Sequence, residues 1–273
     1  MNIQKTNKMA IKVATYSDTC KSIEEHLNNI EGRDILVRMG GTMDYSKYPI
    51  HINSKMGTEI STDKFRFMQF SQAPLPTSII FNLETIRAFA GGGEDNGIHA
   101  FTREYIGPRD LRPEFIIKPL ASSGGEGIQI IPFTGNYGFY NDILGKIGPF
   151  IIQPRINVTS EYRIHVCSNG EFKVTKKLKN NPEDQFITRG NHKVIAIENA
   201  VKPRKYKEMI AACQKTASLM GMEIICFDVL YDSSLKDDHQ FFIVESNTGP
   251  ELIGSTKEWY IKQINNLIQE KTK

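Results

Sequence analysis

Two carboxylates and an amide stand out in the segment 224–249, which reads IICFDVLYDSSLKDDHQFFIVESNTG. Asp228 lies inside the first apolar run, and Glu245 and Asn247 lie at the end of the second. The pattern is typical of two strands joined by a polar loop, so these side chains would meet at one end of a hairpin. A carboxylate in an apolar strand is costly unless a cation compensates its charge. The segment therefore predicts either a hard cation such as Mg²⁺ between the carboxylates, or an arginine partner for Asp228 with Glu245 capping a turn.

A glycine-rich hairpin is the second feature that could do chemistry. Residues 115–133 read FIIKPLASSGGEGIQIIPF, with Lys118 in one strand, small residues at 122–127 and a second strand at 128–131. Small residues let backbone amides approach phosphate oxygens, and Lys118 supplies a compact positive charge. A Walker A loop is excluded because no Gly-Lys-Ser/Thr follows and the next element is a strand. A plain tight turn, with Lys118 reaching solvent, explains the pattern equally well.

Alternating strands lie between these two features. Residues 161–167, EYRIHVC, alternate charged and apolar side chains, and a turn at 168–170 leads into a second alternating run at 171–178. We expect Arg163 and Lys176 to share a polar face with a ligand between them. The alternative is that both are solvated strand charges.

The rest of the chain supplies elements that would position these residues. The expected strands are 9–16, 34–38, 78–81 and 150–156, and the expected helices are 17–29, 61–70, 202–220 and 255–270. The order strand, helix, strand at the start predicts a small α/β module. The helix at 202–220 is amphipathic and should pack on the sheet that holds Asp228.

Composition narrows the class of protein. The 273 residues carry a net charge of +3 from 34 basic and 31 acidic residues that are mostly interspersed, which does not predict a nucleic-acid surface. No apolar stretch is long enough for a signal or a membrane span. Four widely spaced cysteines without a C-x-x-C pair indicate reduced core residues in a cytoplasmic protein. They are Cys20, Cys167, Cys213 and Cys226.

The order of these pieces resembles the ATP-grasp superfamily from about residue 61 to the carboxyl end. The matching pieces are FIIKPLASSGGEGI, EYRIHV with the Lys176-Lys177 pair, and FDVL with VESNTGPEL. Upstream, DILVRMGG, INS and TDKFRFM resemble phage and bacterial ligases of the ribosomal-protein glutamate ligase type. The resemblance implies an α+β ATP-grasp fold, in which ATP lies between two antiparallel-sheet subdomains (61–155 and 156–273). An N-terminal α/β module (1–60) precedes them.

Family roles carry over to individual positions. The resemblance implies Lys118 on the α and β phosphates, Lys64 as a second nucleotide-side lysine, Gln153 at the adenine and Glu161 near the ribose. The loop backbone that would cover the phosphates comprises Ser122, Ser123, Gly124, Gly125 and Gly127.

The resemblance also implies a metal site and a set of charge-stabilising residues. Asp228, Glu245 and Asn247 would hold one or two Mg²⁺ ions, with Mn²⁺ as a substitute. The residues that would stabilise charge in the reaction are Arg163, Lys176 and Arg189, with Asn191 close by. Many such ligases carry an arginine two residues before the metal aspartate, where this chain has Cys226.

The implied activity is an ATP-dependent ligase that phosphorylates a carboxylate and lets an amine attack the acyl phosphate. Its partners would be small-molecule or peptide carboxylates and amines. A kinase that stops at phosphoryl transfer and a non-catalytic nucleotide-binding module are the alternatives. The sequence leaves the oligomeric state open between a monomer and a homodimer, an assembly common among such folds.

Overall fold

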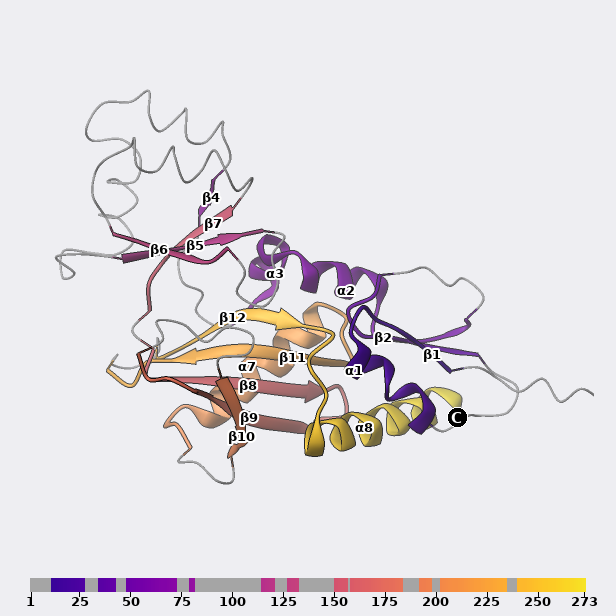
Figure 1. The fold of residues 1–273 in the computed structure, drawn as a ribbon. Coiled ribbons are helices and arrows are strands. Elements are labelled where there is room, and N and C mark those ends of the chain that lie inside the picture. The colour runs from indigo at the N-terminus through magenta and orange to yellow at the C-terminus, as the bar shows by residue number, and fades with distance from the viewer. Residues whose placement is uncertain are drawn as a thin grey trace, which may run out of the picture.

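Three β-sheets make up the frame of the described chain in a computed structural model (Figure 1). The structure describes residues 11–27, 34–42, 48–72, 79–81, 114–120, 127–132, 150–156, 158–183, 192–197, 202–234 and 240–273. Two of the sheets are antiparallel and one is parallel. The combination of helices with antiparallel sheets confirms the predicted α+β class.

The amino-terminal sheet is parallel and has the order β1-β2-β3. Its strands are β1 (Ile11–Ala14), β2 (Ile35–Arg38) and β3 (Ile50–Ile52). The first two strands were predicted, and β3 was not. The side chains of β2 are buried on both faces, which is usual where a parallel sheet is covered on both sides.

The single helix expected at 17–29 is wrong. The described residues form one turn of helix, α1 (Asp18–Lys21), followed by the 3₁₀ turn η1 (Glu24–His26). A carboxylate oxygen of Glu24 accepts a hydrogen bond from the backbone amide of Val13 at 2.8 Å. This contact joins the 3₁₀ turn to β1.

The four-stranded sheet is antiparallel, with the order β4-β7-β5-β6. Its strands are β4 (Ile79–Phe81), β5 (Glu114–Pro119), β6 (Gln129–Pro132) and β7 (Phe150–Pro154). Strands β5 and β6 pair as the predicted hairpin, from Glu114 opposite Pro132 to Ile117 opposite Gln129.

The five-stranded sheet is also antiparallel, with the order β10-β9-β8-β11-β12. Its strands are β8 (Ser160–Cys167), β9 (Phe172–Lys179), β10 (His192–Ala196), β11 (Ile224–Tyr231) and β12 (Phe241–Asn247). Strands β11 and β12 form the predicted hairpin, and β11 also pairs with β8.

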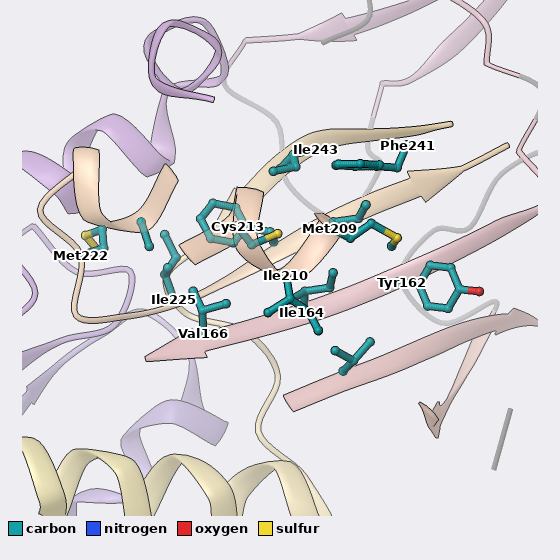
Figure 2. Packing of buried hydrophobic residues seen from close by; sticks show 14 of the residues in the cluster. Tyr162, Ile164, Val166, Met209, Ile210, Cys213, Met222, Ile225, Phe241 and Ile243 are labelled. Carbon is teal, nitrogen blue, oxygen red and sulfur yellow. The ribbon is translucent and has the colours of Figure 1, made fainter. Parts of the chain in front are cut away.

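One face of this sheet carries the main hydrophobic core. Helix α7 (Tyr206–Leu219) packs there, as Figure 2 shows. Tyr162, Ile164 and Val166 alternate along β8 on this face. The helix contributes Met209, Ile210 and Cys213, all buried. The expected packing of this helix on the sheet is therefore confirmed.

Helix α8 (Gly254–Thr272) packs against the opposite face. Its buried side chains include Tyr260 and Ile264, which join Cys167 and Ile224 of the sheet and residues of the amino-terminal sheet in a second core cluster. All four cysteines are buried and free, as expected. In the described part of the chain, the helices lack the combined length and apolarity that a membrane span requires.

Helices α2 (Lys55–Thr62) and α3 (Lys64–Phe70) follow the amino-terminal sheet and pack near β12. Asp63 caps α3, because its side chain accepts hydrogen bonds from the second and third amides of that helix. Ile60 and Phe67 enter the α7 core cluster. The capped helix at α3 was predicted, whereas α2 was not.

Candidate active site

On the face of the five-stranded sheet opposite α7, polar side chains that are far apart in the sequence lie close together. Arg163 of β8 lies opposite Asp228 of β11, and Asp228 in turn lies opposite Glu245 of β12. Asn247 lies opposite Cys226, two residues along each strand. Because side chains alternate across a strand, Asp228, Glu245 and Asn247 occupy the face away from the α7 core.

A β-bulge between Asp228 and Val229 sets this arrangement. Asp228 pairs with Glu245 and Val229 pairs with Ile243, so Val244 is an extra residue on β12. Without the extra residue, strict alternation would place Glu245 on the same face as the buried Ile243. The bulge lets Ile243 remain in the core while Glu245 lies opposite Asp228.

Asp228 is held by two cations. Arg163 donates from Nε to Oδ1 at 3.0 Å, and its Nη2 lies 3.5 Å from Oδ2. Lys177 Nζ donates to Oδ2 at 2.8 Å and also bonds the carboxylate of Glu161. The side chains of Lys177 and Asp228 are 5% and 13% exposed, so the pair is shielded from solvent screening.

These contacts decide the protonation of the cluster. Burial alone would raise the pKa of Asp228, but Lys177 and Arg163 outweigh burial and hold that pKa well below its usual range. Burial likewise opposes the charge of Lys177, yet Asp228 and Glu161 raise its pKa above the ordinary value. Asp228 is therefore ionised and Lys177 protonated at neutral pH.

Glu245 interacts with the two lysines expected on the nucleotide side. The pKa of Glu245 is raised, because burial and the charge of Asp228 outweigh the opposing effect of Lys64 and Lys118. Burial lowers the pKa of both lysines, and the charge of Glu245 opposes that effect. Lys118 comes from the four-stranded sheet and Lys64 from α3, so three elements converge on Glu245.

Lys176 does not share the polar face with Arg163, and that expectation is wrong. The register pairs Glu161 with Lys177 and Tyr162 with Lys176. Lys176 Nζ lies 5.9 Å from the centre of the Tyr162 ring, on the side of the apolar residues. The side chain that faces Asp228 is Lys177, which sequence reasoning missed as a site residue. The turn at 168–170 could have identified Lys177, since a β8–β9 hairpin with this turn pairs Lys177 with Glu161.

The other described candidates lie around this centre. Gln153 is buried in β7 and its amide lies 3.8 Å from the sulfur of Met68. The Asn247 side-chain oxygen accepts the amide of Gly249 at 3.0 Å. Gly127 has φ +73°, the left-handed conformation that glycine adopts readily.

Several predicted residues lie outside the described residues. They are Ser122, Ser123, Gly124, Gly125, Arg189 and Asn191. Their assignments stay predictions.

The chemistry of the donors suits a hard cation. Two carboxylates and an amide offer oxygen ligands on one face, which Mg²⁺ prefers to nitrogen or sulfur. Among the described residues, no three His, Cys, Asp or Glu side chains form a metal-binding group. Asn247, bound water and phosphate would have to complete the coordination.

A cavity of about 800 Å³ lies elsewhere, between the start of α2, the end of α7 and the end of α8. Its lining includes His51, Lys55, Glu223 and Lys271. The candidate site residues do not line it.

Comparison with solved structures identifies the architecture. The chain matches D-alanine–D-alanine ligase from Bacillus anthracis complexed with ATP (TM-score 0.61, 10% identity, 97% of each chain covered). Another structure of that ligase gives the same TM-score and identity, with 96% and 95% covered. VanG D-Ala:D-Ser ligase from Enterococcus faecalis gives a TM-score of 0.57 at 15% identity, with 82% of this chain and 66% of that chain covered. No family model matches the sequence, and none of the curated proteins does.

At these identities the likeness concerns the fold. The chain has the ATP-grasp fold shared by these ligases, as the order of sequence features predicted.

Proposed function

We propose that this protein is an ATP-dependent carbon–nitrogen ligase that joins a carboxylate to an amine through an acyl phosphate, with release of ADP and phosphate. The observation that carries the proposal is the convergence of Lys118, Lys64 and Arg163 with Asp228 and Glu245 on the ATP-grasp fold. The structural neighbours are named as ligases of D-alanine with D-alanine or D-serine, and one was solved with ATP. These names support ATP use and a carboxylate–amine reaction.

Lysines from two elements would hold the nucleotide phosphates. Burial lowers the pKa of Lys118 and Lys64, and their interaction with Glu245 opposes that effect. Phosphate oxygens would replace the water lost on burial, so each lysine would bind more strongly than an exposed lysine. The backbone of residues 122–127 would cover the phosphates, and Gln153 would lie at the adenine.

Arg163 and Lys177 would stabilise the charge that develops when the carboxylate attacks the phosphoryl group. Both are protonated and partly enclosed, and neither needs to move a proton. Fixed cations of this kind act on the transferring phosphoryl group without a protein nucleophile. Arg189 and Asn191 are proposed to act on the same group.

Asp228, Glu245 and Asn247 would hold the Mg²⁺ ion or ions. When bound, the metal would neutralise phosphate charge and orient the transferring group. Mn²⁺ has similar ligand preferences and should substitute.

The substrates would be small-molecule or peptide carboxylates and amines. The upstream DILVRMGG and TDKFRFM pieces favour the ribosomal-protein glutamate ligase type. The interspersed acidic and basic residues of the sequence do not favour a nucleic-acid partner.

One assay distinguishes the ligase from the other two functions considered above. The protein is incubated with Mg-ATP, pools of amino acids and other carboxylates, and hydroxylamine, and ADP and hydroxamate are followed. Hydroxamate with ADP supports the ligase, whereas ADP with a stable phosphorylated product supports the kinase. Nucleotide binding without either product supports the non-catalytic module.

Glu245→Gln is the matched variant for this assay, because the amide keeps the shape of the side chain and removes its charge. We expect hydroxamate formation to fall about 100-fold or more, as for loss of a group that stabilises a transition state. Thermal unfolding checks that the variant is folded. Undiminished turnover would contradict the assignment of Glu245 to the metal and nucleotide site.

A further inference from the structure

Both carboxylate oxygens of Asp228 are already occupied by cations of the protein. Arg163 Nε contacts Oδ1 at 3.0 Å and Lys177 Nζ contacts Oδ2 at 2.8 Å. The same Asp228 is the carboxylate that the proposed function assigns to the metal. In the free protein, Arg163 and Lys177 therefore occupy the two oxygens through which Asp228 would bind the metal.

The cations around Asp228 also disfavour binding of a metal ion alone. Arg163 and Lys177 both lie within hydrogen-bond distance of the Asp228 carboxylate. A metal ion alone would have to displace both cations without offering them another anion. A metal–nucleotide complex would also bring phosphates to which the displaced cations could turn.

We propose that Arg163 and Lys177 act as surrogate cations that hold Asp228 in the free protein and release it when the metal binds together with the nucleotide. The proposal rests on the proposed function of this site. Released from Asp228, Arg163 and Lys177 would turn to the phosphates, which need the positive charge. Metal and nucleotide would therefore bind with strong positive coupling, and the metal alone would bind weakly.

The coupling makes a reciprocal prediction. If the nucleotide raises metal affinity, then the metal raises nucleotide affinity by the same factor. We expect this factor to be about tenfold or more, within the usual range for coupled sites. Removing the surrogate cation should raise affinity for the metal alone and lower affinity for the nucleotide, so the two measurements should move in opposite directions.

The experiment measures Mn²⁺ binding by electron paramagnetic resonance, with no nucleotide present and with saturating ADP. The informative variant is the double substitution Glu161→Gln with Lys177→Met. It removes both members of the Glu161–Lys177 ion pair together, while Oδ2 of Asp228 loses its lysine partner. Lys193→Met, an exposed change on β10, controls for loss of one distant positive charge.

The expected result is that wild-type protein binds Mn²⁺ about tenfold more weakly without ADP than with it. The double variant should bind Mn²⁺ about tenfold more tightly than wild type without ADP, and Lys193→Met should match wild type. Circular dichroism and thermal unfolding verify the fold. If the double variant proves unfolded, Arg163→Lys, which keeps the charge but loses the paired guanidinium contacts, is measured in the same way and should also bind Mn²⁺ more tightly without ADP.

Two results would overturn the inference, and they differ. Equal Mn²⁺ affinity with and without ADP, unchanged in the variants, would contradict the surrogate-cation role and leave the proposed ligase intact. No Mn²⁺ or ADP binding by wild-type protein under any condition would overturn the proposed function and this inference with it.

Discussion

Lys177 and Lys176 are neighbours in sequence but lie on opposite faces of β9, so substituting each tests the geometry of the site. Lys177 contacts Asp228, whereas Lys176 lies beside Tyr162. We expect Lys177→Met to lower hydroxamate formation about 100-fold, as for loss of one charge-stabilising donor. Lys176→Met should lower it far less. Equal losses in the two variants would contradict the register that places only Lys177 at the site.

The buried side chain of His165 should make the stability of the protein depend on pH. Its ring is buried beside Arg163, and its Nδ1 lies 3.2 Å from the Tyr260 hydroxyl. Burial and the charge of Arg163 lower its pKa from 6.5 to about 3, although Asp228 opposes this, and Lys173 adds to the lowering. The native state therefore keeps the ring neutral where the unfolded chain takes up a proton.

The direction in which pH changes the stability of the protein follows from this difference in proton uptake. Between pH 6.5 and about 3 the unfolded state binds more protons at this position, so acidification destabilises the native state. The contribution reaches about 1.4 kcal/mol per pH unit. His165→Gln removes it, and urea unfolding from pH 7 to 4 should show a flatter pH dependence than wild type. Parallel curves for the two proteins would show that His165 is not held neutral.

At the scale of elements, Gly57 decides how closely α2 packs against the end of α7. A Cβ added at Gly57 would lie 2.3 Å from the carbonyl oxygen of Met220, which is a backbone atom and cannot move aside easily. In an exposed helix, alanine would be more stable than glycine by about 1 kcal/mol. Here we expect Gly57→Ala to destabilise the protein by about 1–3 kcal/mol, because overpacking outweighs propensity.

Chemical denaturation measures this effect, with Thr62→Ala as the control in the same helix. Thr62 is exposed, so its substitution should change the free energy of unfolding by less than about 0.5 kcal/mol. A Gly57→Ala protein as stable as wild type would mean that α2 and α7 do not approach as closely as described.

Most strands near the site could be predicted because they are apolar or alternating runs with clear turns. The β11–β12 hairpin and β8 with β9 are of this kind. Helix α2 was missed because its sequence, KMGTEIST, contains a glycine and β-branched residues that lower helix propensity. Tertiary contacts stabilise it instead, including the hydrogen bond between Ser246 and Ser61 at 3.0 Å.

Residue type and order predicted which carboxylates would lie together, while the roles assigned to them stay predictions. Asp228 and Glu245 were singled out because charge in an apolar run is costly, and the structure pairs them across the hairpin. The arginine alternative for Asp228 is confirmed, since Arg163 contacts it, and the metal interpretation stays a prediction. The Lys176 assignment failed because register is a long-range property that a shift of one residue inverts.

At the scale of the whole molecule, Asn53 joins the amino-terminal sheet to the five-stranded sheet. Its side-chain amide donates to the carbonyls of Arg38 at 2.8 Å and Ile224 at 2.9 Å. Its side-chain oxygen accepts the amides of Glu223 and Ile224, both at 2.9 Å. Asn53 is fully buried and has φ +65°, a conformation that asparagine tolerates better than most residues.

Asn53→Ala would leave these buried backbone groups without partners, so we expect the free energy of unfolding to fall by about 3 kcal/mol or more. Asn53→Gly relieves the backbone conformation but not the lost hydrogen bonds, and should be nearly as destabilised. Urea unfolding measures both. A glycine variant as stable as wild type would show that backbone strain, and not hydrogen bonding, dominates at this junction.

The proposed function requires that the protein phosphorylates a carboxylate. The most direct measurement follows the carboxylate oxygen. The protein is incubated with Mg-ATP and a pool of amino acids whose carboxyl oxygens are ¹⁸O-labelled, and the released phosphate is analysed by mass spectrometry. An acyl-phosphate pathway requires one ¹⁸O atom to pass from the carboxylate to phosphate, so singly labelled phosphate is the predicted result. Phosphate released together with amide product but carrying no ¹⁸O would contradict the account.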